Sequence, residues 1–115
     1  MRRGEIWQVD LDPGRGNDAN KKRPAVIVSN DRANATADRL GRGVITPVPI
    51  TSNVANVYPF QVRLSAATSG LTASSKAQAE QVRSVSVERL LRRIGRVSPN
   101  ELDELDEALR LHLQL

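Results

Sequence analysis

Apolar and polar residues alternate in the first part of the chain. Trp7, Val9 and Leu11 fall on one side of an extended backbone, and polar residues occupy positions 8, 10 and 12. A period of two residues predicts a strand with one buried face. A Pro-Gly pair ends this strand, and the small, polar and charged residues at 14–22 predict a surface loop.

A second strand is predicted at residues 24–28, PAVIV. This short, continuous apolar run is typical of a strand buried on both faces. Ser29, Asn30 and Asp31 come next, and they suit either the cap of a short helical turn or the start of a loop that continues to Arg42.

A third strand is predicted at residues 44–50, VITPVPI, and a polar Thr-Ser-Asn triplet follows it at 51–53. Pro47 and Pro49 lack a backbone N–H on the same side of this strand. That side cannot pair there, so the strand is expected at an edge or a corner of the sheet.

Weaker strand signals occupy the middle of the chain. Apolar residues alternate with polar ones over 60–64 and predict a fourth strand. A Thr-Ser-Gly turn is expected at 68–70. The alternation from Leu71 to Val87 predicts two more strands around Glu80 and Gln81.

The last segment has the pattern of a capped helix. Ser98 suits the N-cap, Pro99 suits the first helical position, and Glu101 completes a capping box. Val97 and Leu102 are spaced as a hydrophobic staple. The predicted apolar stripe consists of Leu102, Leu105, Leu109 and either His112 or Leu113.

These elements amount to five to seven short strands, a C-terminal helix and one or two helical turns. They predict a mainly β fold with some α structure: a compact, SH3-like or barrel-like curved antiparallel sheet with helices packed outside it. The 115 residues contain no linker or internal repeat, so we expect a single domain over 1–115.

Composition excludes several classes of protein. The chain has no cysteine and one histidine, His112, which rules out disulfides, Cys-based zinc sites and His-based catalytic triads. No apolar run approaches the ~18 residues of a membrane span. The N-terminus has no apolar stretch behind its arginines, so no secretory signal is expected and the chain is assigned to the cytoplasm.

Charge is unevenly distributed along the chain. The formal net charge is +4, yet residues 98–115 carry five acids and one base, or −4, so the remaining residues carry +8. A basic body attracts polyanions such as nucleic acid or acidic protein segments. The alternative interpretation is that these basic residues form an ordinary solvated surface with no polyanionic partner.

Two polar groups stand where the predicted strands hold the backbone rigidly. Arg23 precedes Pro24 at the entrance of one strand, and Thr51 follows the proline-rich strand. A rigidly held guanidinium and hydroxyl suit the stabilisation of charge on a phosphate. A surface arginine and a turn threonine explain the same spacing, so the residues alone leave both readings open.

Five stretches in order resemble a known family. They are RGEIWQVDLDPGRG from Arg3, KKRPAVIVSND from Lys21, VPITSN from Val48, AEQVRSVSVERL from Ala79 and IGRVS from Ile94. In this register they are similar to the MazF/PemK/Kid-type toxins, and the resemblance covers nearly the whole chain. It implies a homodimer that cleaves single-stranded RNA at short sequences without ribosome, metal or cofactor. A cognate antitoxin with an acidic tail is implied as the neutralising partner.

The resemblance also implies roles for individual residues. Arg23 corresponds to the family's catalytic arginine and Thr51 to its catalytic hydroxyl residue. The implied RNA-binding residues are Asp18, Lys22, Ser52, Asn53, Glu80, Gln81 and Arg83.

Three positions depart from the family pattern. Asp18 and Glu80 each differ by one methylene from the usual glutamate and aspartate. Gln78 stands where the Kid branch has an arginine implicated in catalysis, so the Kid-type catalytic set does not transfer.

RNA supplies its own nucleophile, the 2′-hydroxyl. The protein must align that oxygen, accept its proton, stabilise the phosphorane and protonate the departing 5′-oxygen, giving a 2′,3′-cyclic phosphate and a 5′-hydroxyl. Arginine is a poor base because its pKa exceeds ~12. The proton acceptor is therefore an unusually placed Arg23, Asp18, Glu80 or water.

Two other functions share this fold or charge. CcdB-type toxins have the same fold and poison a protein target such as DNA gyrase without catalysis, and an RNA-binding module would bind without cutting. Fold alone does not separate these possibilities.

Overall fold

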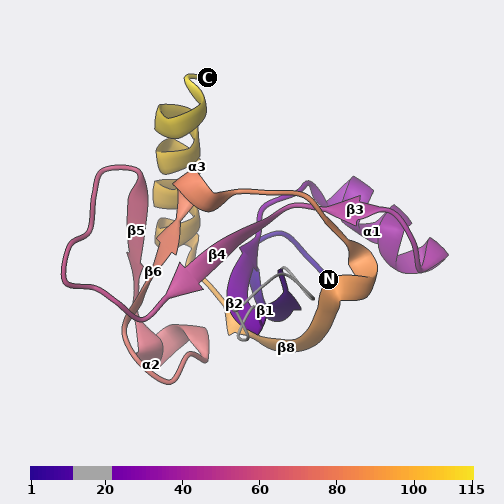
Figure 1. Ribbon diagram of the computed structural model, residues 1–115, viewed down its shortest axis with the longest axis horizontal. Helices are drawn as coiled ribbons and strands as arrows, with labels where there is room; N and C mark the ends of the chain where they lie inside the picture. Colours follow the sequence, from indigo (N-terminus) through magenta and orange to yellow (C-terminus); the bar gives the residue numbers. More distant parts are fainter. Residues whose placement is uncertain (12–21) are drawn as a thin grey trace, which may run out of the picture.

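The computed structural model describes residues 1–11 and 22–115 (Figure 1). The strands are β1 (Glu5–Asp10), β2 (Lys22–Ile27), β3 (Val44–Ile45), β4 (Pro47–Thr51), β5 (Gln61–Leu64), β6 (Ser75–Gln78), β7 (Val85–Ser86) and β8 (Leu90–Arg96). The helices are α1 (Asp31–Leu40), α2 (Ala66–Ser69), α3 (Pro99–Leu113) and two 3-10 turns, η1 (Ala79–Gln81) and η2 (Val87–Arg89).

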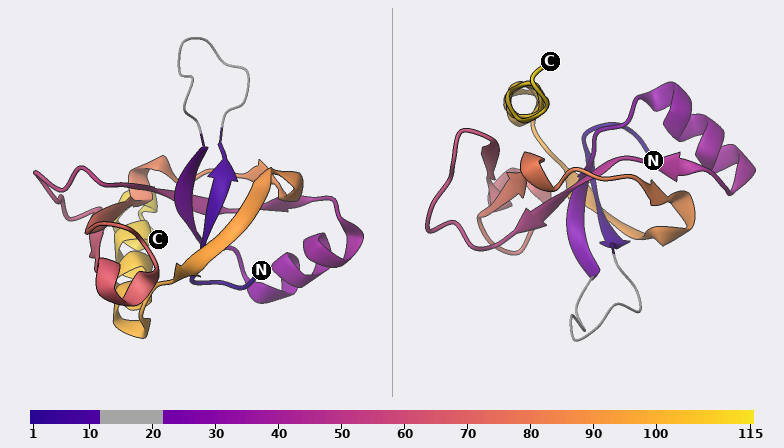
Figure 2. Two further views of the ribbon diagram at one scale, coloured as in Figure 1. Left: turned by 90° about the horizontal axis from the view of Figure 1, so that it is seen from below. Right: turned by 45° about the horizontal axis from the view of Figure 1, so that its top comes forward.

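Six strands form one curved antiparallel sheet in the order β5-β6-β4-β2-β1-β8, and β3 pairs with β7 in a separate ribbon. Helices α1 and α3 lie at opposite ends of the molecule (Figure 2). The predicted mainly β fold with a curved sheet and a C-terminal helix is therefore confirmed. In the described part of the chain the sheet is open at β5 and β8, so the barrel is not closed.

β1 follows the predicted alternation only in part. Val9 and Leu11 are buried as predicted, but Ile6 is completely buried and Trp7 only half-buried. The pairing of β1 with β8 shifts register twice, between Ile6 and Trp7 and between Gln8 and Val9. Such irregularities change which side chains face the core.

β2 lies between β1 and β4 and is buried on both faces, as predicted. Val26 belongs to the apolar cluster beneath α3, whereas Ala25 and Ile27 belong to the cluster beneath α1. Lys22 is the first residue of β2, so its assignment to the preceding loop is wrong.

The segment after β2 is a helix of ten residues, longer than the predicted turn. The Asn30 side chain accepts a hydrogen bond from the Ala33 N–H at its N-terminus. Gly41 ends it in the left-handed conformation, with φ of 67°. Both caps are those that an isolated α-helix prefers.

The proline-rich segment forms two strands. β3 belongs to the small ribbon and β4 to the main sheet, so the chain turns a corner between them. Only β2 pairs with the Pro47–Pro49 part of β4, and β6 joins at Ile50 and Thr51. The corner is confirmed, and among the described strands none pairs with the other side of Pro47–Pro49, as predicted. β4 as a whole is not an edge strand, because β6 joins it beyond the prolines.

α3 is capped as predicted. Ser98 Oγ accepts from the Glu101 N–H at 3.1 Å, and Glu101 Oε1 accepts from the Ser98 N–H at 2.8 Å. Leu105 is fully buried, while His112 and Leu113 are exposed, so the buried stripe ends at Leu109. None of the described helices is long and apolar enough to cross a membrane.

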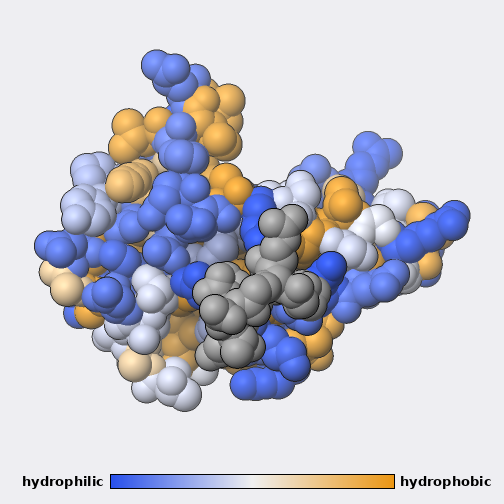
Figure 3. Space-filling view, in the orientation of Figure 1, coloured by the Kyte–Doolittle hydropathy of each residue, from blue (hydrophilic) through white to orange (hydrophobic). Residues whose placement is uncertain are grey.

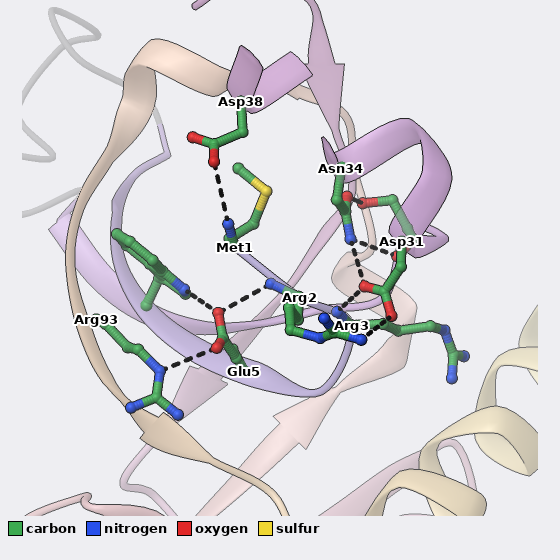
Figure 4. A network of polar contacts seen from close by, with 10 residues as sticks. Met1, Arg2, Arg3, Glu5, Asp31, Asn34, Asp38 and Arg93 are labelled. Atoms are coloured by element: carbon green, nitrogen blue, oxygen red, sulfur yellow. Dashed lines mark hydrogen bonds and ion pairs between the residues drawn. The ribbon is translucent and has the colours of Figure 1, made fainter. Parts of the chain in front are cut away.

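Polar contacts tie the N-terminal segment to α1 and β8 (Figure 4). Arg3 Nε donates to the Val28 carbonyl at 3.0 Å, its guanidinium pairs with Asp106 on α3, and its backbone N–H donates to Asp31. Burial of Glu5 opposes ionisation, but hydrogen bonds from Trp7, the Arg2 backbone and Arg93 outweigh it and lower the pKa of Glu5. These contacts fix the start of β1 against α1, α3 and β8.

Candidate active site

Arg23 is the second residue of β2, and its guanidinium connects three neighbouring strands. Nη2 donates to the Ile50 carbonyl on β4 at 3.0 Å and to Gln78 Oε1 on β6 at 2.8 Å. Because Thr51 directly follows Ile50, the first of these bonds fixes the guanidinium one peptide unit from the Thr51 backbone. The strand-entrance and strand-exit positions predicted for Arg23 and Thr51 are confirmed.

The Arg23 side chain is half-buried, and this burial lowers the pKa of its guanidinium. The ordinary pKa of arginine is so high that the group stays charged at neutral pH. A partly desolvated cation interacts with a phosphate more strongly than one in bulk water. The geometry therefore favours charge stabilisation by Arg23.

Thr51 ends β4, and its hydroxyl organises the turn that follows. Its Oγ1 accepts from the Asn53 N–H at 3.2 Å, and Asn53 Oδ1 accepts from the Ala55 N–H at 3.2 Å. A hydroxyl that accepts in this way keeps its own hydrogen for a different acceptor. Thr51 can thus donate a hydrogen bond to a bound anion.

Arg23 and Thr51 line the same hollow, with a volume of about 310 Å³. One side is formed by the ends of β2 and β4, and the facing wall by the segment that precedes and begins β6. The lining residues are Lys22, Arg23, Pro24, Ile50, Thr51, Ser52, Leu71, Thr72, Ala73 and Ser75. We call this hollow the Arg23 groove.

The far wall of the Arg23 groove follows α2, which packs tightly on β8. A Cβ on Gly95 would lie 1.8 Å from the Ser69 carbonyl oxygen, and one on Gly70 would lie 2.5 Å from the Ile94 carbonyl oxygen. Only glycine allows this approach of two backbones. The glycine pair therefore fixes the chain where residues 71–75 begin, and four of these residues line the Arg23 groove.

A larger hollow of about 740 Å³ lies between α3 and β5. Three carboxylates, from Asp103, Glu104 and Glu107, line it together with one arginine, Arg63. Net negative charge repels phosphate, so its size does not make it the better nucleic-acid site. Apolar side chains are exposed near the protruding end of α3 (Figure 3), among them Leu111, Leu113 and Leu115.

The structure brings together four of the residues predicted from the sequence: Lys22, Arg23, Thr51 and Ser52. Asn53 lies in the adjoining turn. Asp18 falls outside the described residues. The remaining three predicted residues, Glu80, Gln81 and Arg83, lie in or just after η1 and do not line the Arg23 groove.

A hydrogen bond from Gln61 holds the Glu80 side chain in place. Its Oε2 accepts from Gln61 Nε2 at 2.7 Å, and Gln61 Oε1 accepts from the Tyr58 N–H at 3.2 Å. Its other oxygen is buried and has no hydrogen-bond partner among the described residues 1–11 and 22–115. Gln81 and Arg83 are exposed.

Sequence reasoning missed two residues of β6, one that contacts Arg23 and one that lies beside Thr51. Gln78 was noted only as a departure from the family, yet it contacts Arg23. Lys76 lies opposite Thr51 in the β4–β6 pairing; it is buried, donates to the Asn56 carbonyl and lies 5.7 Å from the centre of the Tyr58 ring. These two residues are brought to the site by the pairing of β6 with β4. That pairing joins segments about 25 residues apart, so no local sequence pattern reveals it.

Comparison with known proteins identifies the class. The family described as "PemK-like, MazF-like toxin of type II toxin-antitoxin system" matches residues 2–113. The chain is 75% identical over 115 residues to endoribonuclease MazF9 of Mycobacterium tuberculosis, covering all of this chain and 98% of that protein. The chain belongs to the PemK-like, MazF-like toxins of type II toxin–antitoxin systems.

Solved structures agree on the fold. An endoribonuclease from a mycobacterial species superposes with a TM-score of 0.77 at 22% identity, covering all of this chain and 92% of that one. MazF from Deinococcus radiodurans superposes with a TM-score of 0.75 at 24% identity, covering all of this chain and 97% of that one. A mycobacterial endoribonuclease in complex with its cognate antitoxin gives 0.74 at 21% identity, covering all of this chain and 96% of that one.

Proposed function

We propose that the chain is a sequence-specific, ribosome-independent endoribonuclease toxin that cuts single-stranded mRNA in the Arg23 groove. Its membership of the MazF-like family and its 75% identity to MazF9, an endoribonuclease, support the reaction class. The main support for this location of the active site is the Arg23 guanidinium. It is fixed by hydrogen bonds to Ile50 and Gln78, and Arg23 lines the same hollow as Thr51.

The groups in the groove match the needs of attack by the RNA's own 2′-hydroxyl. Arg23 holds the scissile phosphate and stabilises the charge that grows on the phosphorane, and Thr51 donates a further hydrogen bond. Lys22 and Ser52 bind the flanking backbone, and Asn53 holds the turn that carries Ser52. The RNA supplies the nucleophile, so this scheme uses no metal or cofactor.

Further RNA contacts are assigned to Glu80 and Gln81 on η1, to Arg83 just after it, and to Asp18. Glu80 is a weaker candidate for direct contact than the others, because one of its oxygens already binds Gln61. The candidates for the proton acceptor are Arg23, Asp18, Glu80 and water; burial lowers the pKa of Arg23, but a guanidinium that stays charged is a poor acceptor.

Three properties of the assembly belong to the same proposal. A cognate antitoxin with an acidic tail binds the basic body, as the complex of a structural relative with its antitoxin suggests. The toxin acts as a homodimer, and the apolar side chains exposed along α3 are surface that a second copy can cover. It works in the cytoplasm, where mRNA is found.

Cleavage of a long single-stranded RNA in EDTA tests the proposal. We expect defined cuts whose fragments have free 5′-hydroxyl ends. Arg23→Ala and Thr51→Val should each lower the rate by roughly a hundredfold, the usual effect of removing one transition-state donor. The matched controls Arg39→Ala and Thr36→Val, both on exposed positions of α1, should cut at the wild-type rate.

Each alternative function gives a different outcome. RNA binding without cuts would identify a binding module. Absence of any RNA interaction by the folded protein would favour a poison of a protein target, as in CcdB-type toxins.

A further inference from the structure

Gln78 is the group that the proposed reaction leaves unused. It is the last residue of β6, and its backbone is fixed by pairing with Gln61 on β5. Its Oε1 accepts from Arg23 Nη2 at 2.8 Å. A guanidinium has donors and no acceptor, so the amide must present its oxygen, and not its nitrogen, to Arg23.

The two hydrogen bonds of Nη2 determine the orientation of the whole guanidinium. One goes to the Ile50 carbonyl and the other to Gln78, and together they use both hydrogens of Nη2. The group is planar, so fixing one nitrogen from two directions also fixes Nε and Nη1. These two nitrogens keep three N–H groups, each of which can donate to a phosphate oxygen.

The amide of Gln78 places no negative charge beside Arg23. Among the described residues the two acceptors of Nη2 are both neutral, a backbone carbonyl and a side-chain amide. A carboxylate at the same place would pair with the guanidinium and weaken its attraction for phosphate. A neutral acceptor orients the arginine without this competition.

We propose that Gln78 is a positioning residue, whose neutral oxygen aims the Arg23 guanidinium at the scissile phosphate while leaving its full charge available. This inference rests on the proposed RNA cleavage in the Arg23 groove. Gln78 acts through Arg23.

Two variants separate orientation from charge. Gln78→Met keeps the side-chain volume and removes the oxygen, so kcat should fall about tenfold to a hundredfold, as for other small misplacements of catalytic groups, with KM little changed. Gln78→Glu keeps an oxygen and adds a negative charge. It should weaken binding of an uncleavable 2′-deoxy oligonucleotide and reduce the slope of log affinity against log salt by about 0.7, the value for one lost phosphate contact on a single strand.

The salt slope of Gln78→Met should equal that of the wild type, because its arginine stays charged. Asn100→Ala, which removes an exposed amide on α3, is the matched control and should leave kcat, KM and the salt slope unchanged. A wild-type kcat in Gln78→Met, or a wild-type salt slope in Gln78→Glu, would overturn the proposal.

Nitrogen-15 NMR of the Arg23 side chain tests the positioning without any cleavage. Rotation of the guanidinium should be slow in the wild type and fast in Gln78→Met. Equal mobility in the two proteins would overturn the positioning role. If the wild type cut no RNA while this difference persisted, the proposed function would fail and the role of Gln78 in holding Arg23 would stand.

Discussion

Gly95→Ala tests the packing that sets the far wall of the Arg23 groove. The added Cβ would lie 1.8 Å from the Ser69 carbonyl oxygen and 2.8 Å from the Ser69 carbonyl carbon. Both neighbours are backbone atoms at the end of α2, so no side-chain rotation can relieve the overlap. Ordinary contact begins at 3.4 Å, so α2 and β8 must separate by about 1.6 Å.

The size of the effect follows from this overlap. Overpacking a close-packed site costs about 1–3 kcal/mol, and a clash between backbones belongs at the upper end of that range. A loss of about 3 kcal/mol should lower the unfolding midpoint of a chain this size by roughly 10 °C or more. Movement of α2 also carries residues 71–75 away from Arg23, so the RNA cleavage rate should fall.

Thermal unfolding by circular dichroism, followed by RNA cleavage below the midpoint, measures both effects. Gly41→Ala is the matched control: its Cβ meets nothing within 4 Å, but its φ is 67°. It should cost only the ~1–2 kcal/mol of a left-handed residue and leave cleavage unchanged. A Gly95→Ala protein as stable as the wild type would refute the proposed contact between α2 and β8.

Three further predictions concern stability and association. The pKa of Glu5 is lowered in the folded protein. Ionised Glu5 therefore stabilises the fold fully above the unfolded pKa of about 4.3, and this stabilisation is lost as pH falls through the lower folded pKa. The free energy of unfolding in urea should depend less on pH for Glu5→Gln in this window, and an unchanged dependence would contradict the lowered pKa of Glu5. Ser98→Ala should lower the free energy of unfolding by about 1 kcal/mol, because the Glu101 N–H loses its acceptor, whereas Ser84→Ala at an exposed position should change it by less than about 0.5 kcal/mol. Equal melting of these two serine variants would contradict the cap. Association with the cognate antitoxin should slow as ionic strength rises, because the basic body attracts an acidic segment; a rate independent of salt in stopped flow would count against charge steering.

Local signals predicted the parts of the fold that depend on neighbouring residues. The capping box of α3 and the buried run of β2 were both read correctly, since each follows from residues only a few positions apart. α1 was underestimated because its apolar face is only two small or polar buried residues, Asn34 and Ala37, which give little periodicity.

Long-range pairing determined what the sequence could not predict. The burial of Ile6 in place of Trp7 depends on bulges opposite β8, and the location of β4 inside the sheet depends on β6. Arg23 and Thr51 were found through the strand ends they occupy and the family resemblance. Gln78 became a contact of Arg23 only through the order β6-β4-β2.

Replacement of a single 2′-hydroxyl is the most direct test of RNA cleavage by attack from within the substrate. An oligonucleotide is made with its mapped cleavage site either fully ribose or with one 2′-deoxy sugar before the scissile phosphate. We expect the ribose form to yield a 2′,3′-cyclic phosphate and a 5′-hydroxyl, and the deoxy form to bind and remain intact. Cutting of the deoxy form at the same bond would show that the nucleophile comes from elsewhere and would contradict the mechanism.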